Sequence, residues 1–221
     1  MKAMILAAGR GERMRPLTDT TPKPLLMAGS KRLIEYHLFN LAEAGFKDVV
    51  INVAWLGEKI INTIGAGEKY NLNIVYSDEG RQALETGGGI YNALPLLGSE
   101  PFLVINGDVW TDYPFKNLYN FALKDKAHLV LVNNPEHHPE GDFSILENRL
   151  TEGGVKKYTF SGIGVYCANF FNGLGQKKFP LAPMIREHIS ENNISGELYS
   201  GHWMDIGTEE RLDEVTNLLE R

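Results

Sequence analysis

The apolar residues of this chain follow two spacings that alternate along its length. Short apolar runs bounded by Gly, Asn or Asp indicate buried strands. In chain order these runs are Met4–Ala8, Val49–Ala54, Asn73–Tyr76, Phe102–Ile105 and Leu129–Val132. Between them, apolar residues recur three and four positions apart, which is typical of helices with one buried face.

Four helical patterns separate the predicted strands. They span Leu33–Ala42, Ile60–Ile64, Gly87–Leu94 and Leu118–Leu123; Gly45 and Gly65 are C-cap candidates, and Pro95 ends the third. Because strands alternate with helices, we predict an α/β fold, a doubly wound and mostly parallel sheet. Ligands of such sheets bind beyond the carboxyl ends of the strands, where Gly9–Arg15, Ser77–Gly80 and Asn106–Asp108 fall.

The pattern changes after Pro135 to shorter strands. We predict strands at Phe143–Leu146, Val155–Phe160 and Gly162–Tyr166, then helices around Pro183–Ser190 and Glu209–Leu219. We interpret this part as a small β-rich insertion followed by two helices. No linker composition divides the chain, so we expect one domain, 1–221, with halves at 1–134 and 135–221.

Composition narrows the class of protein. Hydrophobic residues make up 43% of the 221 residues and charged residues 23%, as in ordinary globular proteins. The net charge of −6 argues against nucleic-acid binding, and the single Cys167 excludes an intrachain disulfide. No apolar run is as long as a membrane span and no signal-peptide pattern is present, so we expect a cytoplasmic protein that does not bind membranes. The oligomeric state is left open, a monomer included.

A glycine-rich and cation-rich loop follows the first strand. It reads Leu6-Ala7-Ala8-Gly9-Arg10-Gly11-Glu12-Arg13-Met14-Arg15-Pro16-Leu17-Thr18, with Pro22-Lys23-Pro24-Leu25 just after it. Glycines let backbone N–H groups approach a phosphate closely, and the loop adds three Arg and one Lys. Arg binds phosphate oxygens in pairs, whereas Lys acts as a point charge. The loop therefore predicts a polyphosphate ligand.

Two common phosphate motifs do not fit this loop. The dinucleotide fingerprint needs a third glycine where the chain has Met14, and a helix that Pro16, Pro22 and Pro24 forbid. The Walker A loop needs Gly-Lys-Ser/Thr, which occurs nowhere in the chain.

The pattern Leu-x-Ala-Gly-x-Gly-x-Arg-Met-x-Pro-Leu-Thr with its downstream Pro-Lys-Pro-Leu resembles the signature of the sugar-1-phosphate nucleotidylyltransferases. Enzymes of this family join a nucleoside triphosphate to a sugar 1-phosphate and release pyrophosphate. The resemblance covers essentially the full chain. It implies a nucleotide-binding half, 1–134, and a sugar-binding half, 135–221.

Two carboxylates are candidate magnesium ligands. Asp108 follows the strand Phe102–Ile105, and Asp205 lies in Trp203-Met204-Asp205-Ile206-Gly207-Thr208. From the residues alone, Asp108 could equally be a turn residue and Asp205 a helix-capping acceptor. The resemblance favours metal binding, because the family carries metal-binding aspartates in both motifs, and Mg²⁺ commonly binds one or two carboxylates together with substrate phosphates.

The resemblance also implies roles for the cations. Arg15, with Arg13, would hold the leaving phosphates, and Lys23 would contact the α-phosphate. A sugar phosphate has a second pKa of about 6 and is largely ionised at neutral pH, so no general base is needed. Charge neutralisation and in-line positioning would then carry the catalysis.

Further residues are expected to contact the two substrates. The nucleotide contacts implied are Leu6, Ala8, Gly9, Gly11, Arg13, Glu79, Thr86, Gly87 and Gly88, with Glu79 as the candidate reader of the base. The sugar contacts implied are Asn106, Asp142, Asn148, Lys156 and Gly162. We interpret the glycines 87–89 as a close backbone approach to the base; a plain helix-entry turn is the alternative. The Glu-Lys-Pro segment of many relatives is missing, so the residue that replaces its sugar-phosphate lysine is left open.

Four later motifs narrow the resemblance to the branch that uses UTP and N-acetylmuramate 1-phosphate in the recycling of bacterial cell-wall sugars. They are Glu-Thr-Gly-Gly-Gly at 85–89, Asp142-Phe143, Thr159–Tyr166 and Trp203–Leu212. A pocket for this sugar should offer its lactyl carboxylate a donor or a cation. The candidates are Arg149, Lys156, Lys157 and Arg186, and the alternative for each is a solvated surface charge. The alternatives are a glucose- or mannose-1-phosphate nucleotidylyltransferase using dTTP, UTP or GTP, or a phosphocholine cytidylyltransferase. A regulatory nucleotide-sugar binder without turnover is less well supported, because Arg15, Lys23, Asp108 and Asp205 are all present.

Overall fold

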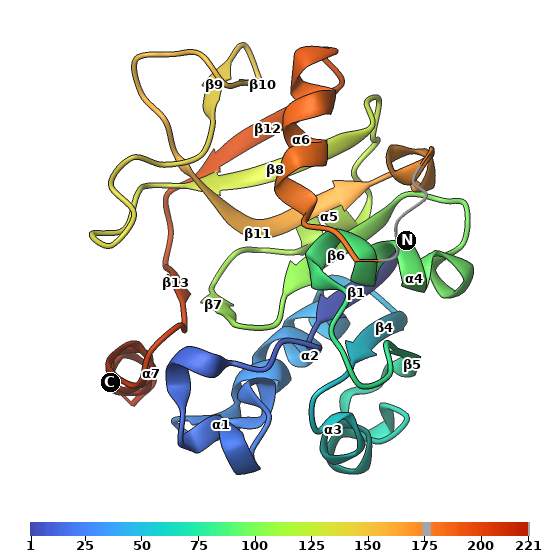
Figure 1. The fold of residues 1–221 in the computed structure, drawn as a ribbon, viewed down its shortest axis with the longest axis vertical. Helices are drawn as coiled ribbons and strands as arrows, with labels where there is room; N and C mark the ends of the chain where they lie inside the picture. Colours follow the sequence, from blue (N-terminus) through green and yellow to red (C-terminus); the bar gives the residue numbers. More distant parts are fainter. Residues whose placement is uncertain (174–177, 221) are drawn as a thin grey trace.

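The computed structural model describes residues 1–173 and 178–220 and contains one large mixed sheet (Figure 1). Its nine strands lie in the order β5-β4-β1-β6-β11-β8-β12-β10-β9. Their bounds are β1 Lys2–Leu6, β4 Asp48–Val53, β5 Asn73–Asp78, β6 Phe102–Asn106, β8 Ala127–Val132, β9 Ser144–Leu146, β10 Arg149–Thr151, β11 Thr159–Tyr166 and β12 Ile194–Tyr199. Two small antiparallel ladders join β2 (Met27–Ala28) to β3 (Lys31–Arg32) and β7 (Val109–Thr111) to β13 (Trp203–Asp205).

Strand direction confirms the doubly wound, mostly parallel sheet. β1 pairs in parallel with both β4 and β6, and β5 extends this set beyond β4. β11 is antiparallel to both of its neighbours, β6 and β8, while β12 is parallel to β8. The carboxyl ends of β5, β4, β1 and β6 therefore lie along one edge of the sheet.

Helices cover both faces of the sheet. They are α1 (Leu17–Thr20), α2 (Leu33–Ala44), α3 (Gly57–Ile64), α4 (Glu85–Leu97), α5 (Lys116–Tyr119), α6 (Leu181–Ser190) and α7 (Glu209–Leu219). One buried cluster joins the sheet to α2 and α3, and a second joins its other face to α4 and α6. No helix in the described residues is long and apolar enough to cross a membrane.

A third buried cluster fixes the C-terminal helix against the N-terminal segment. Leu212 and Val215 of α7 pack with Met14, Leu26 and Leu33. Figure 1 shows α7 and β13 beside the blue N-terminal segment. The chain therefore returns, after the β-rich part, to the loop that follows β1.

Most predicted boundaries hold within two residues, and the predicted C-caps are confirmed. Gly45 caps α2 at a φ of 101° and Gly65 caps α3 at a φ of 67°. Both values lie in the left-handed region that glycine adopts without strain.

Five predicted elements differ from the structure. β1 ends at Leu6, not Ala8, and α5 covers only residues 116–119. α4 continues past Pro95 to Leu97, because a proline this close to a helix end removes only one hydrogen bond and Gly98 N–H closes the last turn on Leu94 O. The two strands predicted over 155–166 are one strand, β11, with a register shift between Phe160 and Ile163 at which Gly162 has a φ of 78°.

Candidate active site

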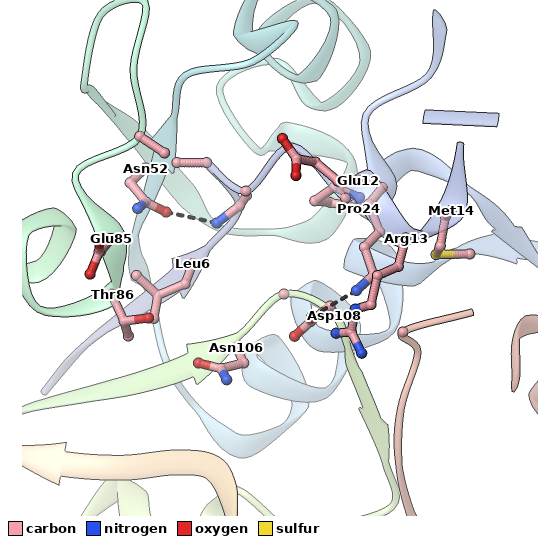
Figure 2. A pocket seen from close by; sticks show the side chains of 18 of the residues that line it. Leu6, Glu12, Arg13, Met14, Pro24, Asn52, Glu85, Thr86, Asn106 and Asp108 are labelled. Carbon is pink, nitrogen blue, oxygen red and sulfur yellow. Dashed lines mark hydrogen bonds and ion pairs between the residues drawn. The ribbon is translucent and has the colours of Figure 1, made fainter. Parts of the chain in front are cut away.

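A cavity of about 440 Å³ opens at the carboxyl ends of β1, β4 and β6, within the size range of small-molecule sites. Its wall consists of Leu6, Ala7, Ala8, Gly9, Gly11, Glu12, Arg13, Met14, Lys23, Pro24, Asn52, Glu79, Ala83, Glu85, Thr86, Asn106, Gly107, Asp108 and Gly207. Figure 2 shows Leu6, Glu85 and Thr86 at one end and Arg13, Met14 and Asp108 at the other. The cavity thus has an end with carboxylates and hydroxyls and an end with cations.

The glycine-rich loop forms the cationic end. A 3₁₀ turn, Glu12–Met14, follows Gly11, whose φ is 69°. A Cβ at Gly11 would lie 3.0 Å from Thr18 Cγ2, so the loop requires glycine there by conformation and by space. Gly9 has open space where a Cβ would stand, and it lines the cavity. Its backbone is therefore accessible to a ligand.

Lys23 and Asp108 form the closest charge pair in the cavity wall. Lys23 Nζ lies 2.7 Å from Asp108 Oδ2, and Lys23 is 7% exposed whereas the Asp108 side chain is 41% exposed (Figure 2). Burial of an ammonium is costly without a partner, so Asp108 holds Lys23 in place in the absence of substrate.

The structure separates the four loop cations into two pairs. Arg13 and Lys23 line the cavity. Arg15 does not: its Nε lies 2.8 Å from Asp19 Oδ1 and its side chain is 55% exposed. Arg10 is also outside the wall, with its guanidinium 4.2 Å above the Trp55 ring. The sequence pattern does not distinguish the pairs, because all four cations lie on one loop.

Asp108 and Asp205 approach each other through the β7–β13 ladder. Asp205 is the register partner of Val109, and Ile206 N–H donates to Asp108 O at 2.7 Å. Asp205 itself does not line the cavity, although Gly207 does. Arg211 of α7 donates to Asp205 Oδ2 at 2.6 Å.

His137 completes this cluster from the loop after β8. Its Nε2 lies 2.8 Å from Arg211 Nη1 and 2.9 Å from Asp205 Oδ1. Since a guanidinium only donates, the imidazole nitrogen accepts from Arg211 and has no proton to give Asp205. Asp205 Oδ1 is accordingly a buried oxygen without a hydrogen-bond donor among the described residues.

These donors fit a hard cation. Asp108 offers an exposed carboxylate at the cavity, and Asp205 Oδ1 is a buried acceptor left without a donor. The described residues hold no group of three or more His, Cys, Asp or Glu placed to bind a metal. A two-carboxylate site agrees with the way Mg²⁺ is usually bound, through one or two carboxylates, substrate phosphates and water.

Glu79 lines the opposite end of the cavity, but both of its carboxylate oxygens are engaged. Asn52 Nδ2 donates to Oε1 at 2.6 Å and Leu84 N–H donates to Oε2 at 2.6 Å. Burial raises the pKa of Glu79 above its ordinary value. Asn52 Oδ1 in turn accepts from Ala7 N–H at 2.7 Å, so the side chain of Asn52 ties β4 to the loop after β1 (Figure 2).

The three glycines of α4 pack against protein and lie outside the cavity wall. A Cβ at Gly87 would lie 2.5 Å from the Phe179 ring, and a Cβ at Gly89 would lie 2.5 Å from Glu79 Oε1. Gly88 N–H donates to Phe179 O. Of the nine expected nucleotide contacts, Gly87 and Gly88 are the two that do not line the cavity. The close backbone approach is real, but it is to Phe179 and Glu79.

The expected sugar contacts do not all converge. Asn106 lines the cavity, and a Cβ at Gly162 would lie 2.6 Å from its Nδ2. Asp142 accepts from Phe160 N–H at 2.8 Å, outside the cavity wall. Asn148, with a φ of 62°, is an exposed turn residue between β9 and β10, and Lys156 Nζ lies 4.8 Å over the Tyr158 ring.

The candidate cations for a lactyl carboxylate also lie outside the wall. Arg149 is paired with Asp125 at 2.7 Å, and Arg186 Nε is 3.8 Å from Glu152. Lys156 and Lys157 lie in the irregular segment that precedes β11, where the sequence predicts a strand over Val155–Phe160. None of the four lines the cavity.

The sequence alone does not predict several residues that line the cavity or contact Asp205. Asn52 is a polar residue within an otherwise apolar strand, and that pattern marks it in hindsight. Glu85 lies two positions before the three glycines, whereas the sequence around His137 and Arg211 gives no sign of a functional role. They meet Asp205 only because α7 and the β8–β9 loop fold against β13.

The comparisons with known proteins agree with this geometry. The family model described as nucleotidyl transferase matches residues 2–158. An N-acetylmuramate alpha-1-phosphate uridylyltransferase from Neisseria meningitidis is 51% identical over 99% of this chain and 98% of its own. A protein of the same name from Caulobacter vibrioides is 32% identical over 93% of this chain and 91% of its own length. A putative glucose-1-phosphate thymidylyltransferase structure from Bacillus anthracis, in complex with a sucrose, has a TM-score of 0.87 at 20% identity, covering 99% of this chain and 94% of that one.

Proposed function

This chain belongs to the nucleotidyl transferase family, and we propose that it joins UTP to N-acetylmuramate 1-phosphate, forming the UDP-sugar and pyrophosphate. The observation that carries the reaction type is a cavity with Arg13, Lys23 and Asp108 at one end and space for a base beside Leu6 and Thr86 at the other. The choice of uracil and of this sugar is supported by the two relatives that bear those substrates in their names.

The reaction is a displacement at phosphorus. An oxygen of the sugar phosphate forms a bond to the α-phosphorus of UTP. The bond from that phosphorus to the oxygen bridging to the β-phosphate breaks, and pyrophosphate leaves with the oxygen and its electron pair. Since the sugar phosphate is already largely ionised at neutral pH, the protein needs no general base.

The residues of the chain act by position and charge. Arg13 and the backbone of Gly9 and Gly11 would hold the leaving phosphates at the cationic end. Lys23 would transfer its contact from Asp108 to the α-phosphate, where negative charge is redistributed in the transition state. Arg15 joins them only if it leaves Asp19.

Asp108 and Asp205 would hold Mg²⁺, which when bound neutralises phosphate charge and aligns the two substrates. Asp108 would then exchange Lys23 for the metal. Arg211 orients Asp205 through Oδ2, and His137 in turn contacts Arg211. Recycling of cell-wall sugars is the setting that such a substrate implies.

A substrate panel tests the proposed activity. Purified protein is incubated with UTP, CTP, GTP or dTTP and with N-acetylmuramate, N-acetylglucosamine, glucose or mannose 1-phosphate, and pyrophosphate release is measured. We expect the highest kcat/KM for UTP with N-acetylmuramate 1-phosphate. Faster turnover of glucose 1-phosphate than of N-acetylmuramate 1-phosphate would remove the substrate assignment but leave the reaction type.

Metal dependence has a separate test. Activity should vanish after treatment with EDTA and return with Mg²⁺. Asp108→Ala and Asp205→Ala should each abolish turnover while circular dichroism stays native. Near-normal rates in both variants would refute the assignment of the two ligands.

A further inference from the structure

Glu85 adopts a backbone conformation that glycine adopts without strain. It is the first residue of α4, and its φ is 62°, in the left-handed region. A side chain in this region costs energy, and residues strained in this way cluster at functional sites. Glycine at this position would remove the cost, yet the chain has a glutamate directly before Thr86.

Glu85 lies where its side chain can contact a ligand. The residue lines the cavity and is exposed, and Figure 2 shows it with Leu6 and Thr86 at the end away from Arg13 and Asp108. Among the described residues its carboxylate has no recorded ion pair. An acidic group in a cavity meant for polyphosphate must lie away from the phosphates, and Glu85 does.

The wall has three other carboxylates, and none is free at the end where Glu85 lies. Asp108 pairs with Lys23 at the cationic end. Both oxygens of Glu79 accept protein N–H groups, from Asn52 and from Leu84. Glu12 lies on the glycine-rich loop beside Pro24, away from Glu85 (Figure 2). Glu85 therefore offers the accessible carboxylate at the base end.

This acceptor fits one edge of uracil. The N3–H of uracil is a donor flanked by two carbonyl groups, whereas cytosine has a lone pair at N3 that a carboxylate repels. An ionised carboxylate only accepts, and its hydrogen bonds are about twice as strong as neutral ones. Resting on the proposed function, we propose that Glu85 determines base specificity: its carboxylate accepts the N3–H of the uracil ring of UTP.

Replacement of Glu85 by glycine tests the proposal without strain. In Glu85→Gly, the ratio of kcat/KM for UTP to that for CTP should fall at least about tenfold. The Tm should hold or rise, since glycine takes this φ freely. UTP methylated at N3 lacks the donor; the wild type should reject it, and Glu85→Gly should use it nearly as well as UTP.

Two further variants separate charge from shape. Glu85→Gln keeps the length and gains a donor for cytosine N3, so CTP use should rise while UTP use falls less than in Glu85→Gly. Glu58→Gln is the matched control, because Glu58 is an exposed glutamate in the first turn of α3. In this variant kcat/KM for UTP and kcat/KM for CTP should both stay unchanged.

Two outcomes would overturn the inference. The first is an unchanged UTP-to-CTP ratio in Glu85→Gly. The second is a change in the ratio of UTP to dUTP instead, which would assign the carboxylate to the ribose 2′-hydroxyl. Failure of the wild type to turn over or bind any pyrimidine triphosphate would contradict the proposed function, and the wild-type panel detects that failure before any variant is made.

Discussion

At the scale of single residues, the basic side chains of the glycine-rich loop differ in burial and in their ion-pair partners. Lys23 is buried and paired with Asp108 in the cavity wall, while Arg15 is exposed and paired with Asp19 outside it. The sequence identifies all four cations but not this division, since it depends on Asp19 and Trp55, which contact the side chains of Arg15 and Arg10.

The division leads to a first prediction. Lys23→Ala should lower kcat about 100-fold or more with a smaller change in KM, because the lost charge acts on the transferred phosphoryl group. Arg15→Ala should cost much less, and Lys31→Ala serves as a control on the same segment. Steady-state kinetics of the three variants test this prediction. An equal loss of kcat in Arg15→Ala and Lys23→Ala would contradict it and show that Arg15 enters the site with substrate.

A second prediction concerns Arg211, which we assign as a positioning residue. It donates to Asp205 Oδ2 and contacts His137, and it does not line the cavity. Arg211→Lys keeps the charge but loses the geometry of the guanidinium, so the Mg²⁺ concentration for half-maximal rate should rise about tenfold. Saturating Mg²⁺ should restore most of kcat. Arg186→Lys is the exposed control; an unchanged Mg²⁺ requirement in Arg211→Lys would contradict the role.

At the scale of elements, glycines that look alike in the sequence serve different purposes. The sequence predicts α4 and its glycine-rich start, yet it cannot tell whether the glycines face a ligand or the protein. Gly87 faces the protein because the ring of Phe179, some ninety positions away in the sequence, packs against it. The same limit explains Asn148 and Lys156, whose local patterns contain nothing about the distance from β9–β10 to the cavity.

Glycine substitutions turn this difference into a third prediction. Gly87→Ala should destabilise the fold by about 1–3 kcal/mol, because its Cβ would lie 2.5 Å from the Phe179 ring. Gly9→Ala should leave stability nearly unchanged but weaken nucleotide binding, since its Cβ points into open cavity space. Urea unfolding and calorimetric titration with UTP measure the two effects. A stable Gly87→Ala variant that loses UTP affinity would restore the sequence-based interpretation of that glycine.

A fourth prediction concerns Glu35, near the start of α2, and the dependence of folding stability on pH. Burial acts to raise the pKa of Glu35, but hydrogen bonds from Lys69, the Arg32 N–H and Tyr70 outweigh it and lower the pKa to about 2. A carboxylate with a lowered pKa stabilises the fold above its unfolded pKa, near 4.5, and this stabilisation is lost as the pH falls towards about 2. Glu35→Gln should therefore cost about 2 kcal/mol at pH 7 and much less at pH 2.5. A cost independent of pH in urea titrations would argue against the ion pair.

At the scale of the whole molecule, one sheet runs through both halves of the chain. The alternation of strands and helices predicts its parallel part. The antiparallel strands β10 and β11 both come after Pro135, where the sequence signals a change of pattern. The meeting of Asp108 with Asp205 could be expected from motif resemblance but not from physics, because the β7–β13 ladder joins residues distant in sequence. His137 and Arg211 follow from the same tertiary contact and so were beyond prediction.

The central claim is that this cavity directs a sugar phosphate to the α-phosphorus of UTP. The most direct measurement uses N-acetylmuramate 1-phosphate labelled with ¹⁸O on the phosphate oxygens and mass spectrometry of both products. The account predicts that all of the label appears in the UDP-sugar and none in pyrophosphate, and that Lys23→Ala and Asp108→Ala form neither product at a significant rate. Label in pyrophosphate, or release of inorganic phosphate in its place, would contradict the account.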